Sequence, residues 1–299
     1  MSDPTFDTLM RQGKVAEALE RAKARLAEAR AGHDDGGAAE ALLDEARAQW
    51  LKGDRDDAVM TVDEAISAAR GAWGPRDPRV AEAFELGAEV AAGSDMPHSA
   101  EARFKAAVEI LVEAGVSGYP LGNALYHHGC FRRDEGDLEG AARGFLAAVD
   151  AVRDADDPEG RALHPTALTA LAQLALAAGR QDEARELADG ALERWVALGQ
   201  ARRVEVADAL SVVGVAALGA GESARAAHFL ETACEIYRGC KGDVRASLAA
   251  AEGAWGEALA ALGRKDDARA SLERAFALYR EGSPERVLIE ERLLELART

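Results

Sequence analysis

Small and apolar residues recur along the chain at fixed distances from a set of glycines. After most of these glycines, the residues 5, 9 and 12 positions further on are small or apolar, as Ala184, Ala188 and Ala191 are after Gly179. Steps of four and three residues place side chains on one stripe of an α-helix. The pattern therefore predicts a helix after each glycine, packed against the protein along one face.

The glycines follow a regular period. They are Gly13, Gly53, Gly93, Gly136, Gly179, Gly221 and Gly263, with separations of 40, 40, 43, 43, 42 and 42 residues. A second stripe precedes most of them, usually with Leu eleven positions back and a small residue seven positions back. The repeat predicts about seven antiparallel helix pairs, each joined by a turn where Gly supplies the positive φ that ends a helix.

Three units depart from this pattern. In the third unit the turn is longer, and the small residue Gly87 is six rather than seven positions before Gly93. The last unit has Glu252 where other units have Leu, and the first unit has little sequence for its first helix. Gly and Pro also cluster in residues 71–80, 115–122 and 154–165, which are expected to be connections.

The pattern of a unit resembles the tetratricopeptide repeat (TPR). It consists of a small residue, a turn glycine and then Ala, a large apolar residue and Ala. The period of about 42 and the His164-Pro165 opening of one unit are most similar to its kinesin-light-chain type, which is common in bacteria. The resemblance implies an all-α fold, an α-solenoid wound as a right-handed superhelix. Residues 1–282 would form the repeats, and residues 283–299 a capping helix that begins with Ser283 and Pro284.

The amino-acid composition indicates the class of fold and makes some partners and locations unfavourable. Apolar residues make up 48% of the 299-residue chain but aromatic residues only 5%, which favours helices over strands. Lys and Arg number 36 against 53 Asp and Glu, a net charge of -17, so nucleic acid is an unfavourable partner. There is no signal-peptide pattern and no run of 18 apolar residues, so a cytoplasmic protein without a membrane partner is expected.

Catalytic motifs are absent from the sequence. There is no HExxH, GxSxG or CxxC, so we expect neither an enzyme nor a cofactor. His127 and Cys130 lie one helical turn apart and could form half of a metal site, but helix packing is the simpler interpretation and no metal is expected. Cys234 and Cys240 could form a redox pair, although idle thiols are commoner.

The family resemblance implies that the first helix of each pair lines a concave groove. Among the residues at the family's groove positions in this sequence, eight are candidate partner-binding residues: Arg47, Trp50, Phe84, Asn123, Tyr126, Arg133, Thr169 and Gln173. Asn123 and Gln173 could hydrogen-bond an extended backbone, while the aromatic residues could anchor its side chains. The alternatives are that Trp50 and Phe84 pack between helices and that Asn123 caps its helix.

The expected function is a non-enzymatic adaptor or scaffold that binds a peptide or protein segment in this groove. The alternative is a peptide-responsive regulatory sensor that resembles bacterial TPR receptors. The identity of the partner, the process, the oligomeric state and the use of the groove or the convex face stay open.

Overall fold

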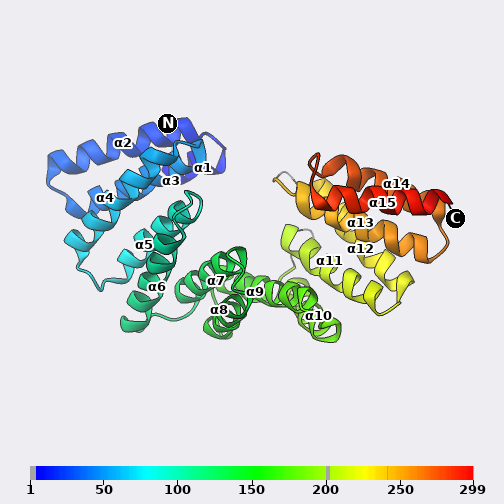
Figure 1. The fold of residues 1–299 in the computed structure, drawn as a ribbon. Helices are drawn as coiled ribbons and strands as arrows, with labels where there is room; N and C mark the ends of the chain where they lie inside the picture. Colours follow the sequence, from blue (N-terminus) through cyan, green and yellow to red (C-terminus); the bar gives the residue numbers. More distant parts are fainter. Residues whose placement is uncertain (1–4, 200–202, 241, 299) are drawn as a thin grey trace. The chain divides into compact units, whose positions relative to one another are not determined.

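A computed structural model describes residues 5–199, 203–240 and 242–298, so the predicted outer boundaries at residues 1 and 299 lie outside the described residues. These ranges form α-helices and no strand (Figure 1). The helices are α1 (Phe6–Arg11), α2 (Val15–Gly32), α3 (Asp35–Lys52), α4 (Arg55–Trp73), α5 (Pro78–Ala92), α6 (Pro97–Glu113), α7 (Tyr119–Asp134), α8 (Leu138–Ala151), α9 (Pro158–Ala177), α10 (Gln181–Ala197), α11 (Val204–Gly219), α12 (Ser223–Gly239), α13 (Arg245–Ala261), α14 (Lys265–Leu278) and α15 (Pro284–Arg298). The all-α solenoid of helix pairs is therefore confirmed, with a six-residue α1 in the weak first unit.

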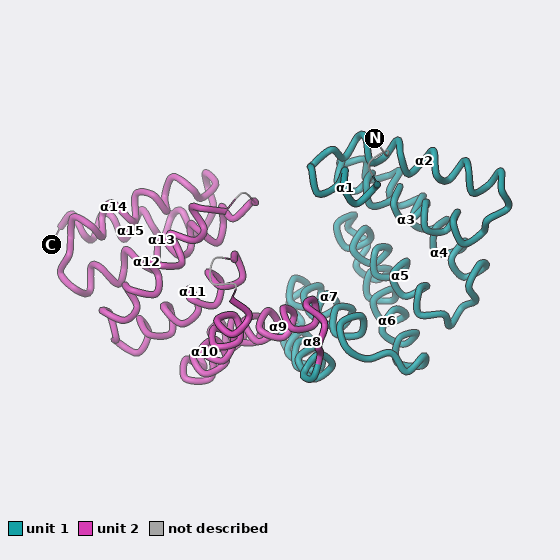
Figure 2. Tube along the Cα trace, turned by 180° about the vertical axis from the view of Figure 1, so that it is seen from behind, with its two compact units in different colours: residues 1–154 teal, residues 155–299 magenta. Residues whose placement is uncertain are grey.

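The chain separates into two compact units (Figure 2). Unit 1 comprises Met1–Asp154 with α1 to α8, and unit 2 comprises Ala155–Thr299 with α9 to α15. Within each unit every helix packs against the next, and contacts also join α3 to α5 in unit 1 and α9 to α11 to α13 in unit 2. The first helices of successive pairs therefore form one layer within each unit, and the second helices form the other. The predicted division of the chain into repeats at residues 1–282 and a capping helix at residues 283–299 stays a prediction.

The two helices of a pair meet where a glycine of the first helix lies against a large side chain of the second. A Cβ atom on Gly129 would lie 2.8 Å from the Phe145 ring, and one on Gly256 would lie 2.7 Å from Leu272. In each pair the glycine is seven residues before the turn glycine, and the large residue is nine residues after it. The two stripes seen in the sequence are therefore one repeated contact.

Six of the seven turn glycines have the expected left-handed backbone. They are Gly13, Gly53, Gly136, Gly179, Gly221 and Gly263, with φ between 72° and 92°. The expectation is wrong for Gly93, whose φ is -78°, and in the longer turn of this unit Asp95 has the positive φ instead. Gly93 is required for another reason, because a Cβ atom there would lie 2.6 Å from Cζ2 of Trp50.

The expected connection at residues 154–165 is shorter than the sequence suggests. Helix α9 begins at Pro158, and the Asp157 side chain caps it by accepting a hydrogen bond from the Gly160 amide at 2.6 Å. Pro165 lies inside the helix, where it donates no backbone hydrogen bond. The proline signal that suggested a connection was wrong, since an N-cap and a first-turn proline already start the helix upstream.

Glu252, the departure in the last unit, is buried with 1% of its surface exposed. Its carboxylate accepts hydrogen bonds from Ser271 at 2.7 Å and from Arg274 at 3.0 Å, and it also pairs with Arg238. Burial alone would raise the pKa of Glu252, but hydrogen bonds from Arg274, Ser271 and Arg238 outweigh it and hold the pKa below its usual value. The residue that breaks the apolar stripe thus joins α12, α13 and α14 through a paired charge.

At the start of α15, the Arg286 amide donates to the Ser283 hydroxyl at 3.3 Å, as the predicted N-cap requires. The buried Ile289 of this helix packs with Leu272 and Ala275 of α14. The helix therefore covers the apolar side of the last pair.

We expect Gly93→Ala to lower the free energy of unfolding by about 2 kcal/mol, because the added methyl group overlaps the Trp50 ring. Gly190→Ala in α10 is the matched control, since no described atom lies within 4 Å of a methyl group added there. It should raise stability by about 1 kcal/mol through helix propensity. Chemical denaturation measures both, and equal effects of the two substitutions would refute the contact.

Candidate functional site

The first helices of unit 1 carry a row of polar side chains on their common layer. We call this surface the first-helix face and define it by Glu40, Asp44 and Arg47 of α3, Glu82, Glu85 and Glu89 of α5, and Asn123 and His127 of α7. The three glutamates of α5 are spaced by three and four residues, which places them on one helical stripe. The face is therefore acidic along its middle helix.

Polar contacts cross this face from helix to helix. Arg25 of α2 pairs with Asp44 and lies 3.5 Å from Glu40, and Arg47 of α3 lies 3.1 Å from Glu82. From α7, Asn123 donates to Glu85 at 3.0 Å, and Nδ1 of His127 lies 3.3 Å from Glu89. The contacts fix the orientation of side chains on adjacent helices.

A hollow of about 320 Å³ opens among these groups. It is lined by Arg47, Glu82, Glu85, Leu86, Glu89, Tyr119, Pro120 and Asn123. A second hollow of about 370 Å³ lies nearer the N-terminus, where Arg21, Arg25, Glu40, Asp44 and Glu82 supply charged groups. Glu82 borders both, so the two hollows adjoin on the first-helix face.

Burial changes the acidity of two carboxyl groups on this face. It raises the pKa of Glu85 to about 7, with the negative charges of Glu89 and Glu82 adding to the rise and the Asn123 hydrogen bond opposing it. It also raises the pKa of Asp44 to about 6, although the charges of Arg25 and Arg47 oppose that shift. Glu85 therefore changes its charge near neutral pH.

Arg47 and Asn123 are the two candidate residues that line the 320 Å³ hollow. Asn123 does not cap α7, whose N-cap is Gly118. Trp50 and Phe84 are partly buried against the core of unit 1 instead, and the guanidinium of Arg55 lies 5.6 Å from the Trp50 ring centroid. The alternative interpretation, that Trp50 and Phe84 pack between helices instead of lining the groove, therefore applies to both aromatic residues.

The other four candidates are not among the residues that line this hollow. The Tyr126 ring packs 5.4 Å from that of Phe145 in α8, and Arg133 donates to Asp134 at 2.9 Å. Thr169 is 4% exposed and its hydroxyl donates to the Pro165 carbonyl at 2.9 Å, whereas Gln173 is exposed. Their role in partner binding stays a prediction.

The sequence interpretation missed Glu82, Glu85 and Glu89. The candidate residues were taken from the family's groove positions, which do not include these three residues in the body of α5. Their spacing of three and four residues was a readable signal, since it repeats one charge along one stripe of an otherwise apolar helix.

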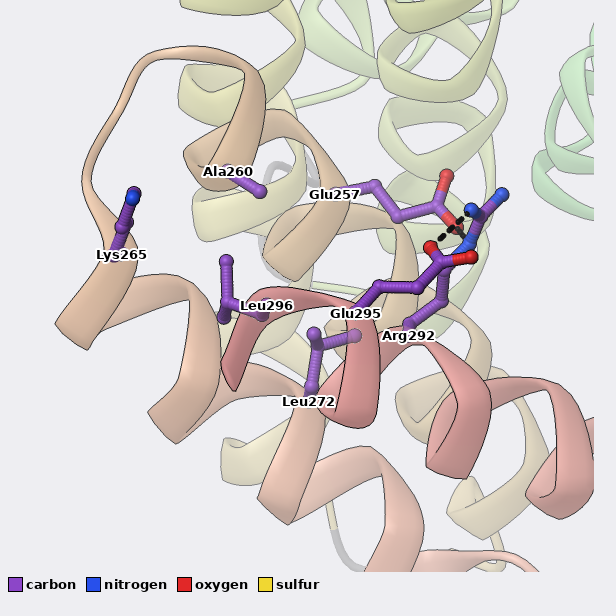
Figure 3. Close-up of a pocket in the computed structure, with 7 residues that line it drawn as sticks. All are labelled: Glu257, Ala260, Lys265, Leu272, Arg292, Glu295 and Leu296. Atoms are coloured by element: carbon purple, nitrogen blue, oxygen red, sulfur yellow. Dashed lines mark hydrogen bonds and ion pairs between the residues drawn. The ribbon is translucent and has the colours of Figure 1, made fainter. Parts of the chain in front are cut away.

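Another hollow, of about 330 Å³, lies in unit 2 beside the last helix (Figure 3). Leu272 and Leu296 provide apolar walls, and Arg292 of α15 pairs with Glu257 of α13 at 3.3 Å and with Glu295 at 2.9 Å. These ion pairs satisfy the charged groups on one side of the hollow. It is thus explained as the junction of α13, α14 and α15.

The described residues contain neither a metal-binding cluster nor a helix that could span a membrane. The described part of the chain has no group of three or more His, Cys, Asp or Glu side chains that could hold a metal ion. His127 contacts Glu89, and burial raises the pKa of the Cys130 thiol. None of the described helices is long and apolar enough to cross a membrane.

Comparisons with known proteins identify the fold. A scan against protein-family models and a search of curated proteins gave no match. Among solved structures, BtubC (BKLC) from P. vanneervenii is similar with a TM-score of 0.63 and 17% identity, over 77% of this chain and 94% of that one. TPR-like repeats assigned to a kinesin light chain from Podosopora anserina match with a TM-score of 0.56 and 15% identity, over 67% and 94%.

The apo form of the quorum sensor NprR from B. thuringiensis is also similar. Its TM-score is 0.62 at 11% identity, and the match covers 98% of this chain and 85% of that one. The chain therefore has a TPR-like fold, as its repeat pattern indicated. At these identities the likeness concerns the fold.

We expect Glu85→Gln to stabilise the protein at pH 8 by about 2 kcal/mol and to have little effect at pH 5. The folded pKa of about 7 lies above the usual value of 4.5. The contribution of the Glu85 carboxyl group to the free energy of unfolding is therefore fully present below about pH 4.5 and is lost as the pH rises through 7. The amide can still bond Asn123 but carries no charge to bury.

Denaturation curves at pH 5 and pH 8 measure this difference. Glu109→Gln removes one charge from an exposed position of α6, where the carboxylate is not buried. It should change the free energy of unfolding by the same amount at both pH values. The burial effect at Glu85 would be refuted if both variants shifted stability equally.

Proposed function

We propose that this protein is a non-enzymatic adaptor or scaffold that binds a protein segment along the first-helix face of unit 1. The observation that carries the proposal is the 320 Å³ hollow lined by polar groups from three successive first helices. A cytoplasmic location forms part of the proposal.

The repeat architecture supports this function. Stacked helix pairs offer an extended surface, on which equivalent positions of successive helices present different side chains. An extended segment that crosses α3, α5 and α7 would meet Arg47, then the glutamates of α5, then Asn123. Amide and guanidinium groups can hydrogen-bond backbone carbonyls, which would orient the segment.

The comparisons support the scaffold class. The TPR-like neighbours include the quorum sensor NprR, and the fold builds a surface of the kind that binds partners. The specific segment bound by this chain is part of the proposal.

The test is photo-crosslinking in native lysate with a benzophenone amino acid at Pro120, which is exposed at the hollow. Leu146 of α8, 55% exposed on the second-helix layer, is the matched position outside it. We expect a discrete crosslinked partner at Pro120 and none at Leu146. Adding Asn123→Ala should weaken capture about tenfold, since it removes an amide of the hollow that would hydrogen-bond the bound segment.

Equal crosslinking at both positions would contradict the use of this face. Capture at Leu146 but not at Pro120 would assign binding to the second helices. Crosslinking at neither position would remove the support for a scaffold.

A second candidate is a peptide-responsive sensor, which the likeness to the quorum sensor NprR over 98% of this chain favours. In this function a bound peptide would change the packing of successive pairs. Small-angle scattering with and without candidate peptides would then show a change in the radius of gyration. Unchanged scattering at saturating peptide would count against a sensor and leave the scaffold intact.

A further inference from the structure

We propose that the 320 Å³ hollow of the first-helix face binds a basic side chain of a partner protein, with its charged head between Glu85 and Glu89. The inference rests on the proposed function, because it names the chemistry of the segment that the face would bind. It adds to that function a specific binding site, here called the seat, for one arginine or lysine side chain of the partner.

The charges that line the hollow are unbalanced. Among its eight lining residues there are three carboxylates, Glu82, Glu85 and Glu89, and one cation, Arg47, which pairs with Glu82. Within the described residues, Glu85 and Glu89 contact Asn123 and His127 and form no ion pair with Arg or Lys. A partner's cation would supply the missing positive charge.

The shape of the hollow suits a long side chain. Leu86, 4% exposed, contributes an apolar surface to it, and Tyr119 and Pro120 at the start of α7 contribute two more. Arg and Lys combine an aliphatic stem with a charged head, so the stem can lie on these surfaces while the head reaches the carboxylates.

A metal ion is a less suitable occupant. The described residues include no set of three or more His, Cys, Asp or Glu side chains close enough to hold one. The glutamates are instead spread along a helical stripe, with an apolar wall beside them. A guanidinium or ammonium group on a flexible stem can bridge such spread carboxylates.

The seat should respond to pH. The titratable and charged groups that surround Glu85 are Arg47 from α3, Glu82 and Glu89 from α5, and Tyr119 and His127 from α7. Because the pKa of Glu85 is raised to about 7, the hollow gains negative charge between pH 6 and pH 8. Affinity for a cation should therefore rise over this interval, and binding near pH 7 should release a proton.

The test compares two fluorescent decapeptides that differ only in charge, one with three arginines and one with three citrullines. Fluorescence anisotropy at low salt would measure their binding to the full chain at pH 6 and pH 8. We expect the arginine peptide to bind about tenfold tighter than the citrulline peptide at pH 8, with a smaller ratio at pH 6. Calorimetry at pH 7 in two buffers of different ionisation enthalpy should detect the released proton.

The double variant E85Q/E89Q should lose this tenfold preference and the proton release. The charge-matched control is E28Q/E109Q, with exposed positions on α2 and α6, and it should retain both. Circular dichroism would verify that both variants are folded.

Equal loss in both double variants, or binding of neither peptide, would overturn the seat. If the two peptides bound equally while Pro120 still crosslinked to a partner in lysate, the seat would be overturned but the proposed scaffold would stand. Tighter binding of spermine than of the arginine peptide would overturn the assignment to a protein side chain.

Discussion

The close approach of the two helices in each pair is the constraint on which the rest of the structure depends. Gly129, Gly214 and Gly256 of three first helices face Phe145, Leu230 and Leu272, respectively, at distances that leave no room for a Cβ atom. In other pairs alanine takes the place of the glycine and a smaller residue lies opposite, as with Ala46 and Val62, both fully buried. The contact is repeated along the chain while the residues that form it change.

This contact uses one face of each first helix and leaves the opposite face free to vary. In unit 1 that face carries charged residues, above all the glutamates of α5. In unit 2 the equivalent helices present uncharged groups, such as the exposed Gln173 of α9 and Val215 of α11. Two surfaces of different chemistry thus rest on the same repeated packing, which is how one fold can serve different partners.

The sequence predicted the packing well because packing is periodic. Spacing of small residues and turn glycines located the helix pairs, but it could not separate two uses of glycine, positive φ at Gly179 and ring clearance at Gly93. The hollow was less predictable. Arg47 and Asn123 were found through their repeat positions, whereas Trp50 occupies a groove position and yet packs against Gly93 from another helix, a contact 43 residues away that no local pattern reveals.

The fully buried Glu252 and the partly buried Glu85 differ in how the fold treats their charge. Glu252 is held by Arg274, Ser271 and Arg238, so its pKa is lowered and its charge links three helices. Glu85 has an amide as its hydrogen-bond partner, and burial raises its pKa to about 7. A carboxylate that the fold leaves without a cation lowers stability when it is charged. In the hollow of the first-helix face, this cost is what binding of a cation, as proposed, would remove, because the bound charge stabilises the ionised carboxylate.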